Sequence, residues 1–314
     1  MNSIANPARY QSVSLFGNEK LLSFVNRLAS FSALPVIHHL FIAGLQVRYI
    51  QMTELGDQYT FERWREMQEE TRAYISKLSV NVHTILVTLA PHLRTLGIHG
   101  WNVDLTADTL PAFPFLHDIT STSKPRHSVT SPTRFPSLRR VHIRARSAHP
   151  AFWLVLAHFA PRATHLRLSG VCEDAHTPRF LRVLLDLPPG HAATADSYAA
   201  GSPEAARAVA LAARFPHLAH VSVQPAPYSD AGGADVHASM EAALAGLAAA
   251  SARGQGVGMF VLLPEQHSYT AEEARRDWLD VVEGGDGPWP PAPDGNASPA
   301  VRAKWAEEGN AYLA

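Results

Sequence analysis

In the segment Pro91-His-Leu-Arg-Thr-Leu-Gly-Ile98, a proline is followed after two, five and seven residues by an apolar residue. Further copies of this form, of which the second and fourth are weaker, begin at Pro35, Pro114, Pro136, Pro161 and Pro216. From Pro91 to Pro161 the copies lie 22 to 25 residues apart, and the outer gaps of 56 and 55 residues each have room for two units. These intervals match the roughly 20 to 29 residues of a leucine-rich repeat.

Each copy predicts one short strand. Val141 and Ile143, for example, are two residues apart and therefore point to the same face of a strand. The runs 82–89, 152–159 and 180–187 have apolar residues at helical spacing. One strand and one helix cannot bury their apolar faces alone, so the units must stack. The sequence predicts an α/β fold, an irregular leucine-rich-repeat-like solenoid with parallel strands on the concave side and helices on the convex side. A compact doubly wound sheet is the main alternative.

The flanks of the repeats are less regular. We expect an N-terminal helical cap region over 1–33, a repeat domain over 34–264, an acidic helix over 265–283, and a Pro/Gly-rich tail with a short helix over 284–314. Within the repeat domain, charged and apolar residues at helical spacing predict an amphipathic helix over 60–78. Further helices are predicted over 203–214 and 236–252, a loop over 192–202, and a buried strand over 259–263.

The composition excludes several classes of protein. The chain of 314 residues has 27 Lys plus Arg and 28 Asp plus Glu, so it is not a globally basic nucleic-acid binder. With 46% hydrophobic residues, disorder throughout is also excluded. Its single cysteine, Cys172, permits no intramolecular disulfide. No secretory signal and no run of 18 apolar residues is found, so we expect a cytoplasmic or nuclear protein without a membrane partner.

Several segments resemble the F-box and leucine-rich-repeat-like proteins of mushroom-forming fungi. They are Arg9-Tyr-Gln-Ser-Val-Ser-Leu15 with 20–28 and 38–42, Leu166-Arg-Leu-Ser-Gly170 with 180–187, and 269–279 with Gly287-Pro-Trp289. The resemblance covers most of residues 9 to 289, and its motifs are loose. It implies a protein whose repeats hold the substrate of a cullin-based ubiquitin ligase. The F-box itself is expected to be absent, since only Met1 to Ala8 precede the resemblance, so ligase docking is expected only if a longer form carries the F-box.

Catalytic motifs are missing from the sequence. We find no Gly-x-Ser-x-Gly elbow, no Walker loop and no His-Glu-x-x-His helix, and Gly254-Gln-Gly-Val-Gly258 precedes a strand, where a helix terminator is the simpler interpretation. His38 and His39 alternate faces of a strand, and His217 and His220 flank a strand start, so neither pair suits a metal ion. We therefore expect no enzyme activity, no cofactor and no metal.

One charge pattern exceeds the background. The segment 134–167 contains seven arginines and four histidines but no Asp, Glu or Lys, whereas 265–286 contains seven acidic residues and two arginines. If Val141 and Ile143 face the core, the residues between and beside them face the other side of the sheet. Applied to each repeat, this register predicts one partner-binding patch made of His99, Arg140, His142, Arg144, His165, Arg167, His220 and Gln224.

The patch suggests what kind of partner the chain binds. Arginine presents a planar fork that suits carboxylate and phosphate, so we expect a protein partner with an acidic or phosphorylated segment. Internal pairing with the acidic C-terminal segment is the simpler alternative. An enzyme of doubly wound fold with dispersed catalytic residues is another, and RNA binding ranks lower because aromatic residues are not interleaved in the block. We expect Arg140→Glu with Arg167→Glu to abolish binding and to leave stability almost unchanged.

Overall fold

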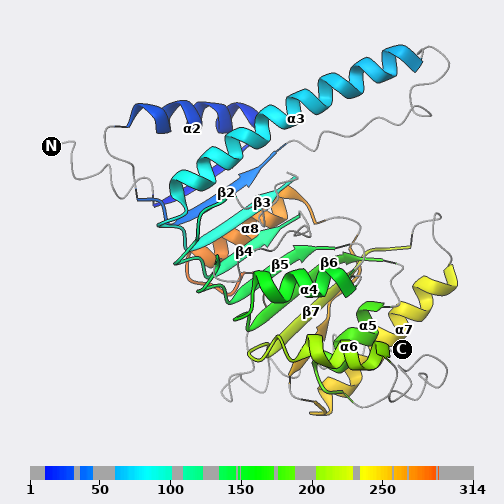
Figure 1. Ribbon diagram of the computed structural model, residues 1–314. Coiled ribbons are helices and arrows are strands. Elements are labelled where there is room, and N and C mark those ends of the chain that lie inside the picture. Colours follow the sequence, from blue (N-terminus) through cyan, green and yellow to red (C-terminus); the bar gives the residue numbers. More distant parts are fainter. Residues whose placement is uncertain are drawn as a thin grey trace.

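The structure, a computed structural model, is described for the following residues: 11–31, 36–44, 61–100, 109–122, 134–145, 148, 150–172, 176–187, 203–228, 234–256, 258–266, 269–287 and 289. It is an α/β protein with an open parallel sheet of eight strands (Figure 1). The strands are β1 (Ser12–Phe16), β2 (His39–Ala43), β3 (Thr95–His99), β4 (Asp118–Ser121), β5 (Arg140–Arg144), β6 (His165–Val171), β7 (His220–Pro225) and β8 (Met259–Leu262).

The strand order follows the chain order without reversal, from β1 at one edge to β8 at the other. All neighbouring strands are parallel. A doubly wound sheet has a point at which the strand order reverses, and this sheet has none. The six proline-led copies are β2 to β7, which confirms that each copy forms one strand of a parallel sheet.

The described helices are α2 (Asn18–Ser30), α3 (Phe61–Leu89), α4 (Pro150–Phe159), α5 (His176–Leu184), α6 (Pro203–Ala212), α7 (Ala234–Ala252) and α8 (Ala271–Val282). One continuous apolar core lies between one face of the sheet and the helices α2 to α7. Alternate strand residues, such as Val141 and Ile143, point into this core and are buried. Helix α8 packs on the opposite face, against β2 and β3.

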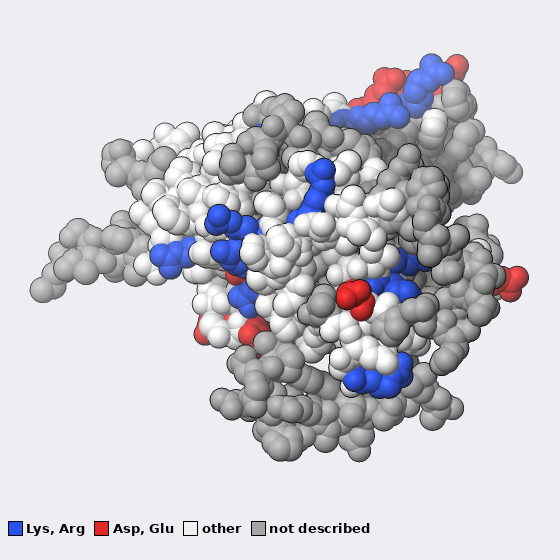
Figure 2. Space-filling view, turned by 60° about the horizontal axis from the view of Figure 1, so that its bottom comes forward, with Lys and Arg blue, Asp and Glu red and all other residues white. Residues whose placement is uncertain are grey.

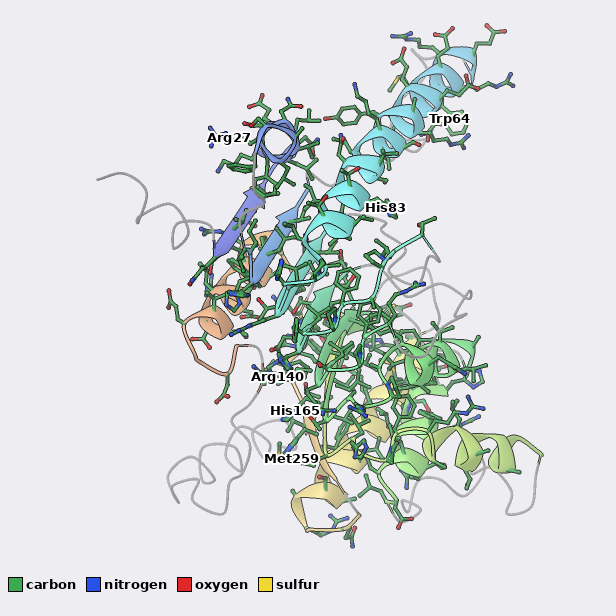
Figure 3. The ribbon with its side chains drawn as sticks, turned by 60° about the vertical axis from the view of Figure 1, so that its left-hand side comes forward. Arg27, Trp64, His83, Arg140, His165 and Met259 are labelled. Carbon is green, nitrogen blue, oxygen red and sulfur yellow. The ribbon has the colours of Figure 1, made fainter. Side chains whose placement is uncertain are left out.

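The two long gaps in the repeat pattern have room for a second unit but add no strand to the sheet in the described part of the chain. β2 pairs directly with β3, and β6 with β7, so neither long gap adds a second strand to the sheet. The gap after β2 contains α3, which is one continuous helix. The sequence instead predicts two helical segments there, over 60–78 and over 82–89. The first half of α3, which carries Trp64, projects away from the sheet (Figures 1 and 3). It buries no side chain before Leu78 among those described, and therefore contributes little to the core.

The predictions for 192–202 and for a terminal helix in 284–314 lie outside the described residues, except for 284–287 and Trp289. Among the helices that are described, each is too short or too polar to span a lipid bilayer.

Candidate binding surface

The sheet face opposite the main core carries the polar side chains that the sequence assigns to a binding patch. Strand register aligns the first residues of the strands, His39, Thr95, Asp118, Arg140, His165, His220 and Met259. Figure 3 shows Arg140, His165 and Met259 following one another along this edge of the sheet. The residues two positions further on form a second row, Phe41, Gly97, Thr120, His142, Arg167, Ser222 and Val261.

The C-terminal segment covers part of this face. Trp278 of α8 packs on Phe41 of β2, with ring centroids 5.7 Å apart, and both side chains are buried. Gly97 of the neighbouring strand makes this possible, because a Cβ at Gly97 would lie 2.5 Å from Cδ2 of Phe41. Arg275 of α8 also donates a hydrogen bond to Ser14 Oγ of β1, at 3.1 Å. The polar face is therefore occupied over β1 to β3 by the protein's own chain.

Tyr269 extends this cover to the middle of the sheet. Its backbone oxygen lies 2.8 Å from Nε2 of His99, and its ring meets the ring of His142 edge-on at 4.7 Å between centroids. The guanidinium carbon of Arg167 lies 5.8 Å from the centroid of the same ring, a cation–π arrangement. The hydroxyl of Tyr269 donates to Asp277 Oδ2 at 2.7 Å. One tyrosine thus contacts three of the residues predicted to bind a partner.

Four predicted binding residues are buried: His99, His142, Arg167 and Gln224. The structure places these four side chains inside the protein, where they bond within the chain, and not on an open surface. Arg167 donates from Nη2 to Gln224 Oε1 at 3.0 Å, and Gln224 donates to the Pro264 carbonyl oxygen at 3.3 Å. His142 Nε2 lies 3.0 Å from Ser169 Oγ.

Burial also sets the charge of these groups. Burial is the main cause that lowers the pKa of His99, and it lowers the pKa of His142 more strongly. Both imidazoles are therefore neutral at pH 7. Burial lowers the pKa of the Arg167 guanidinium and raises the pKa of the Asp277 carboxyl. Arg167 lies over the Tyr269 ring and Asp277 accepts from the Tyr269 hydroxyl, and the opposite charges of the two groups partly offset these shifts. Internal interaction with the acidic C-terminal segment, the alternative interpretation of the arginine block, therefore applies to Arg167.

The other four predicted residues are half-buried: Arg140, Arg144, His165 and His220. Arg140 pairs with Asp118 of the neighbouring strand, a partner that lies outside the arginine block and that the sequence pattern did not indicate. The rings of His165 and His220 stack at 4.4 Å between centroids. Burial, followed by the nearby His220 and Arg140, lowers the pKa of His165 to about 4. The predicted patch is therefore a set of internal contacts more than an open surface.

A different basic surface lies at the amino-terminal ends of the strands. The residue before the first residue of β2 to β5 is basic each time, and these four are His38, Arg94, His117 and Arg139. Their backbones form a ladder in which the N–H of each donates to the carbonyl oxygen of the one before, at 2.7 to 2.9 Å. Arg162, from the next repeat, joins them because Arg139 Nη1 donates to its carbonyl oxygen at 3.1 Å. We call these five residues the basic edge.

The arginines of the basic edge have no acidic partner within the described part of the chain. Arg94 and Arg162 are exposed, Arg139 is half-buried, and the ion pairs of the described residues involve none of the three. Figure 2 shows several Lys or Arg side chains on the left of the surface, with Asp or Glu side chains below them. A sequence signal for the basic edge was present. A basic residue recurs three positions after the proline of four copies, those that begin at Pro35, Pro91, Pro114 and Pro136.

The described part of the chain offers one buried thiol and one cluster of potential metal ligands. Cys172 is buried. His38 Nδ1 contacts the His92 carbonyl oxygen and His39 Nδ1 contacts Thr95, so the two imidazoles do not converge on one point. Among the described residues, one group of three potential ligands comes together, and it consists of His237, Glu241 and Glu265.

Comparison of the chain with protein families, with curated proteins and with solved structures finds no match. The assignment of a function therefore depends on the geometry alone.

Proposed function

We propose that this chain is a non-enzymatic, protein-binding scaffold of leucine-rich-repeat-like units. The support is the strictly sequential order of eight parallel strands, with one strand for each proline-led copy of the sequence pattern. Stacked units of this kind contact only their neighbours and present repeated side chains at regular intervals, which suits the recognition of an extended partner.

The basic edge is the surface that we assign to the partner. The sheet face that the sequence favours is taken up at its centre by Tyr269, whereas Arg94 and Arg162 at the amino ends of the strands are exposed and have no carboxylate partner among the described residues. An uncompensated row of arginines is the single observation that carries the proposal. Guanidinium groups bind carboxylate and phosphate through paired N–H donors, so the partner carries acidic or phosphorylated residues.

The spacing of the row gives the size of the partner segment. Strands in a sheet lie about 4.8 Å apart, so His38 and Arg139, three strands apart, are separated by about 14 Å. An extended peptide rises about 3.3 Å per residue, so about four to five residues span this distance. We therefore propose an extended acidic or phosphorylated segment of this length that crosses the strand ends.

The resemblance to fungal F-box proteins supports a narrower proposal. In that family the repeats hold the substrate of a ubiquitin ligase, and the basic edge would then be the site that reads an acidic or phosphorylated substrate. Contact with a cullin-based ligase adaptor is proposed only for a longer form that carries an F-box.

The test is a binding titration with labelled peptides. A phosphoserine peptide and a Glu/Asp-rich peptide should bind the parent protein, and an uncharged peptide of the same length should not. Arg94→Glu/Arg139→Glu/Arg162→Glu should abolish binding. The control Arg72→Glu/Lys77→Glu/Arg253→Glu changes the net charge equally at exposed positions elsewhere, and should bind as the parent does.

Three outcomes contradict the proposal. In the first outcome, neither acidic peptide binds the parent protein. In the second, both triple variants lose binding equally, which would show that overall charge and not the basic edge is responsible for binding. In the third outcome, a single-stranded RNA of matched charge binds more tightly than either peptide, with affinity that falls steeply as salt rises.

A further inference from the structure

Three side chains of ligand type converge near the carboxyl ends of the last two strands, at the end of the sheet opposite the basic edge. His237 and Glu241 are four residues apart on α7 and therefore lie on one face of that helix. Glu265 follows β8 closely in the chain. The potential ligand atoms of these residues all lie within 4.8 Å of one another.

The distances between these groups are long for direct hydrogen bonds and are compatible with a shared ion. His237 Nε2 lies 3.4 Å from Glu265 Oε1 and 3.5 Å from Glu241 Oε1, both longer than the usual 2.9 to 3.0 Å of an N–H···O bond. Ligands at about 2.0 to 2.2 Å from a tetrahedral zinc ion are separated from one another by roughly 3.3 to 3.6 Å. The two separations from His237 Nε2 are compatible with the edges of a tetrahedral site.

The histidine is held rigidly for this role. His237 is 6% exposed, its ring packs against that of Tyr228 at 5.8 Å between centroids, and Nε2 is the atom that faces both carboxylates. Its Nδ1 is buried and meets no hydrogen-bonding atom in the described part of the chain. A metal bond at Nε2 leaves the ring proton on Nδ1, so His237 would bind as a neutral imidazole.

The segment that carries Glu265 is fixed by backbone bonds on both sides. The Leu263 N–H donates to the Val223 carbonyl oxygen at 2.8 Å, and the Gln266 N–H donates to the Pro225 carbonyl oxygen at 3.1 Å. The third ligand is thereby held against β7, while the other two belong to α7. The site is thus assembled from two elements that are positioned independently of any ion.

We propose that His237, Glu241 and Glu265 bind one divalent transition-metal ion, with Zn²⁺ as the best fit. Imidazole together with carboxylates suits Zn²⁺ and its first-row neighbours, whereas Mg²⁺ and Ca²⁺ prefer oxygen ligands alone. Three protein ligands leave a coordination position for water. The ion would join α7 to the end of β8. It would also reach the C-terminal segment, because Gln266 donates to Glu273 of α8 at 2.6 Å.

The test is a titration of the full chain, freed of metal by a chelator, with Zn²⁺ alone in a calorimeter and with Co²⁺ alone in a spectrophotometer. We expect one tight equivalent of Zn²⁺ and the visible bands of four-coordinate Co²⁺. Glu241→Gln and Glu265→Gln should each weaken binding by more than about tenfold, the loss that even supporting residues of metal sites produce. Asp235→Asn removes an exposed carboxylate from the same turn of α7 and should bind as the parent does.

His237 is buried, so a His237→Gln variant that fails to fold would not test the site. The two glutamate variants keep the test decisive in that case, because these side chains are 40% and 41% exposed and do not belong to the apolar core. The chain has 17 histidines, so surface binding is the competing explanation. The proposal is overturned if no equivalent of Zn²⁺ binds, if Glu241→Gln and Glu265→Gln bind as the parent does, or if Mg²⁺ competes at equal concentration.

Discussion

The ring of Tyr269 stands edge-on against the imidazole of His142, with 4.7 Å between the ring centroids. Tyr269 precedes α8, whereas His142 is the middle residue of β5, a strand at the centre of the sheet. This contact shows that the polar face of the sheet is in part an interior. Side chains on that face have to be judged by their partners within the chain before they are assigned to a ligand.

Substitution of Arg167 should destabilise the protein, whereas substitution of an exposed arginine should have little effect on stability. Arg167→Glu places a carboxylate beneath Tyr269 and close to Asp277, and removes the donor that Gln224 accepts from. We expect a loss of more than about 3 kcal/mol in the free energy of unfolding, measured by urea denaturation. Arg162→Glu, at an exposed position, should change it by no more than about 1 kcal/mol. Equal stabilities of the two variants would contradict the burial of Arg167.

Leu138 tests the repeat register. It is the first apolar residue of its proline-led copy and is fully buried in the main core. Leu138→Ala should therefore lower the free energy of unfolding by about 2 to 5 kcal/mol, because it leaves a cavity. Leu154 is 44% exposed on α4, so Leu154→Ala provides a control with the same chemical change and a much smaller expected loss. A neutral Leu138→Ala would place that copy in a different register.

A substitution at Gly97 tests how α8 packs on the sheet. A methyl group at this position meets the Phe41 ring, which in turn holds Trp278. Gly97→Ala should therefore cost about 1 to 3 kcal/mol of stability, as overpacking does, and should loosen α8 first. Hydrogen exchange followed by mass spectrometry should show faster exchange over 269–282 than over β5 and β6. Gly246, on α7, has open space around it, and Gly246→Ala should show no such change. Uniform acceleration in Gly97→Ala would argue against a separately seated α8.

Two histidines on the polar face of the sheet should make the protein less stable as the pH falls. The pKa of His165 is lowered to about 4, chiefly by burial, while an unfolded histidine has a pKa near 6.5. Between these two values the unfolded state binds more protons than the native state, so stability is lost as the pH drops from about 6.5 to 4. His142, whose pKa burial lowers strongly, acts in the same direction.

The measurement is the urea midpoint at pH 7 and at pH 5. His165→Gln should show a smaller drop between the two than the parent does, and His217→Gln, at an exposed position, should show the parent's drop. The comparison is between variants because burial raises the pKa of Asp118 and of Asp277, which opposes the histidines at low pH. An unchanged drop in His165→Gln would mean that its imidazole is protonated as readily in the native state as in the unfolded one.

The strands could be predicted because their signal is local. Each proline-led copy spans eight residues, and its apolar positions fix both the strand and the face that it buries, as Val141 and Ile143 illustrate. The long gaps were ambiguous because a count of residues does not distinguish two short units from the single helix α3. The break expected within α3 is absent because residues 79–81 include no proline or glycine. The apolar residues on either side, Leu78 and Val82, are four positions apart and so continue the helical spacing.

The cover over the polar face could not be predicted from the strand register. Register gives the face on which His142 and Arg167 lie, but Tyr269 reaches them from a segment more than 100 residues away in sequence. One local signal did point to the start of α8. Thr270 and Glu273 form a capping box in which Thr270 Oγ1 accepts from the Glu273 N–H at 3.2 Å and Glu273 accepts from the Thr270 N–H at 2.8 Å.

The bond between Arg275 and Ser14 joins residues that are 261 positions apart, while the strands of the sheet pair in chain order. During synthesis, strands that pair with the preceding unit can assemble as they leave the ribosome, since few of their contacts wait for later sequence. The cover over His142 and Arg167 can form only after Tyr269 and α8 have emerged. A nascent chain therefore leaves the polar face of the sheet open to water until Tyr269 and α8 have been synthesised, and the packing of α8 on β1 to β3 comes last.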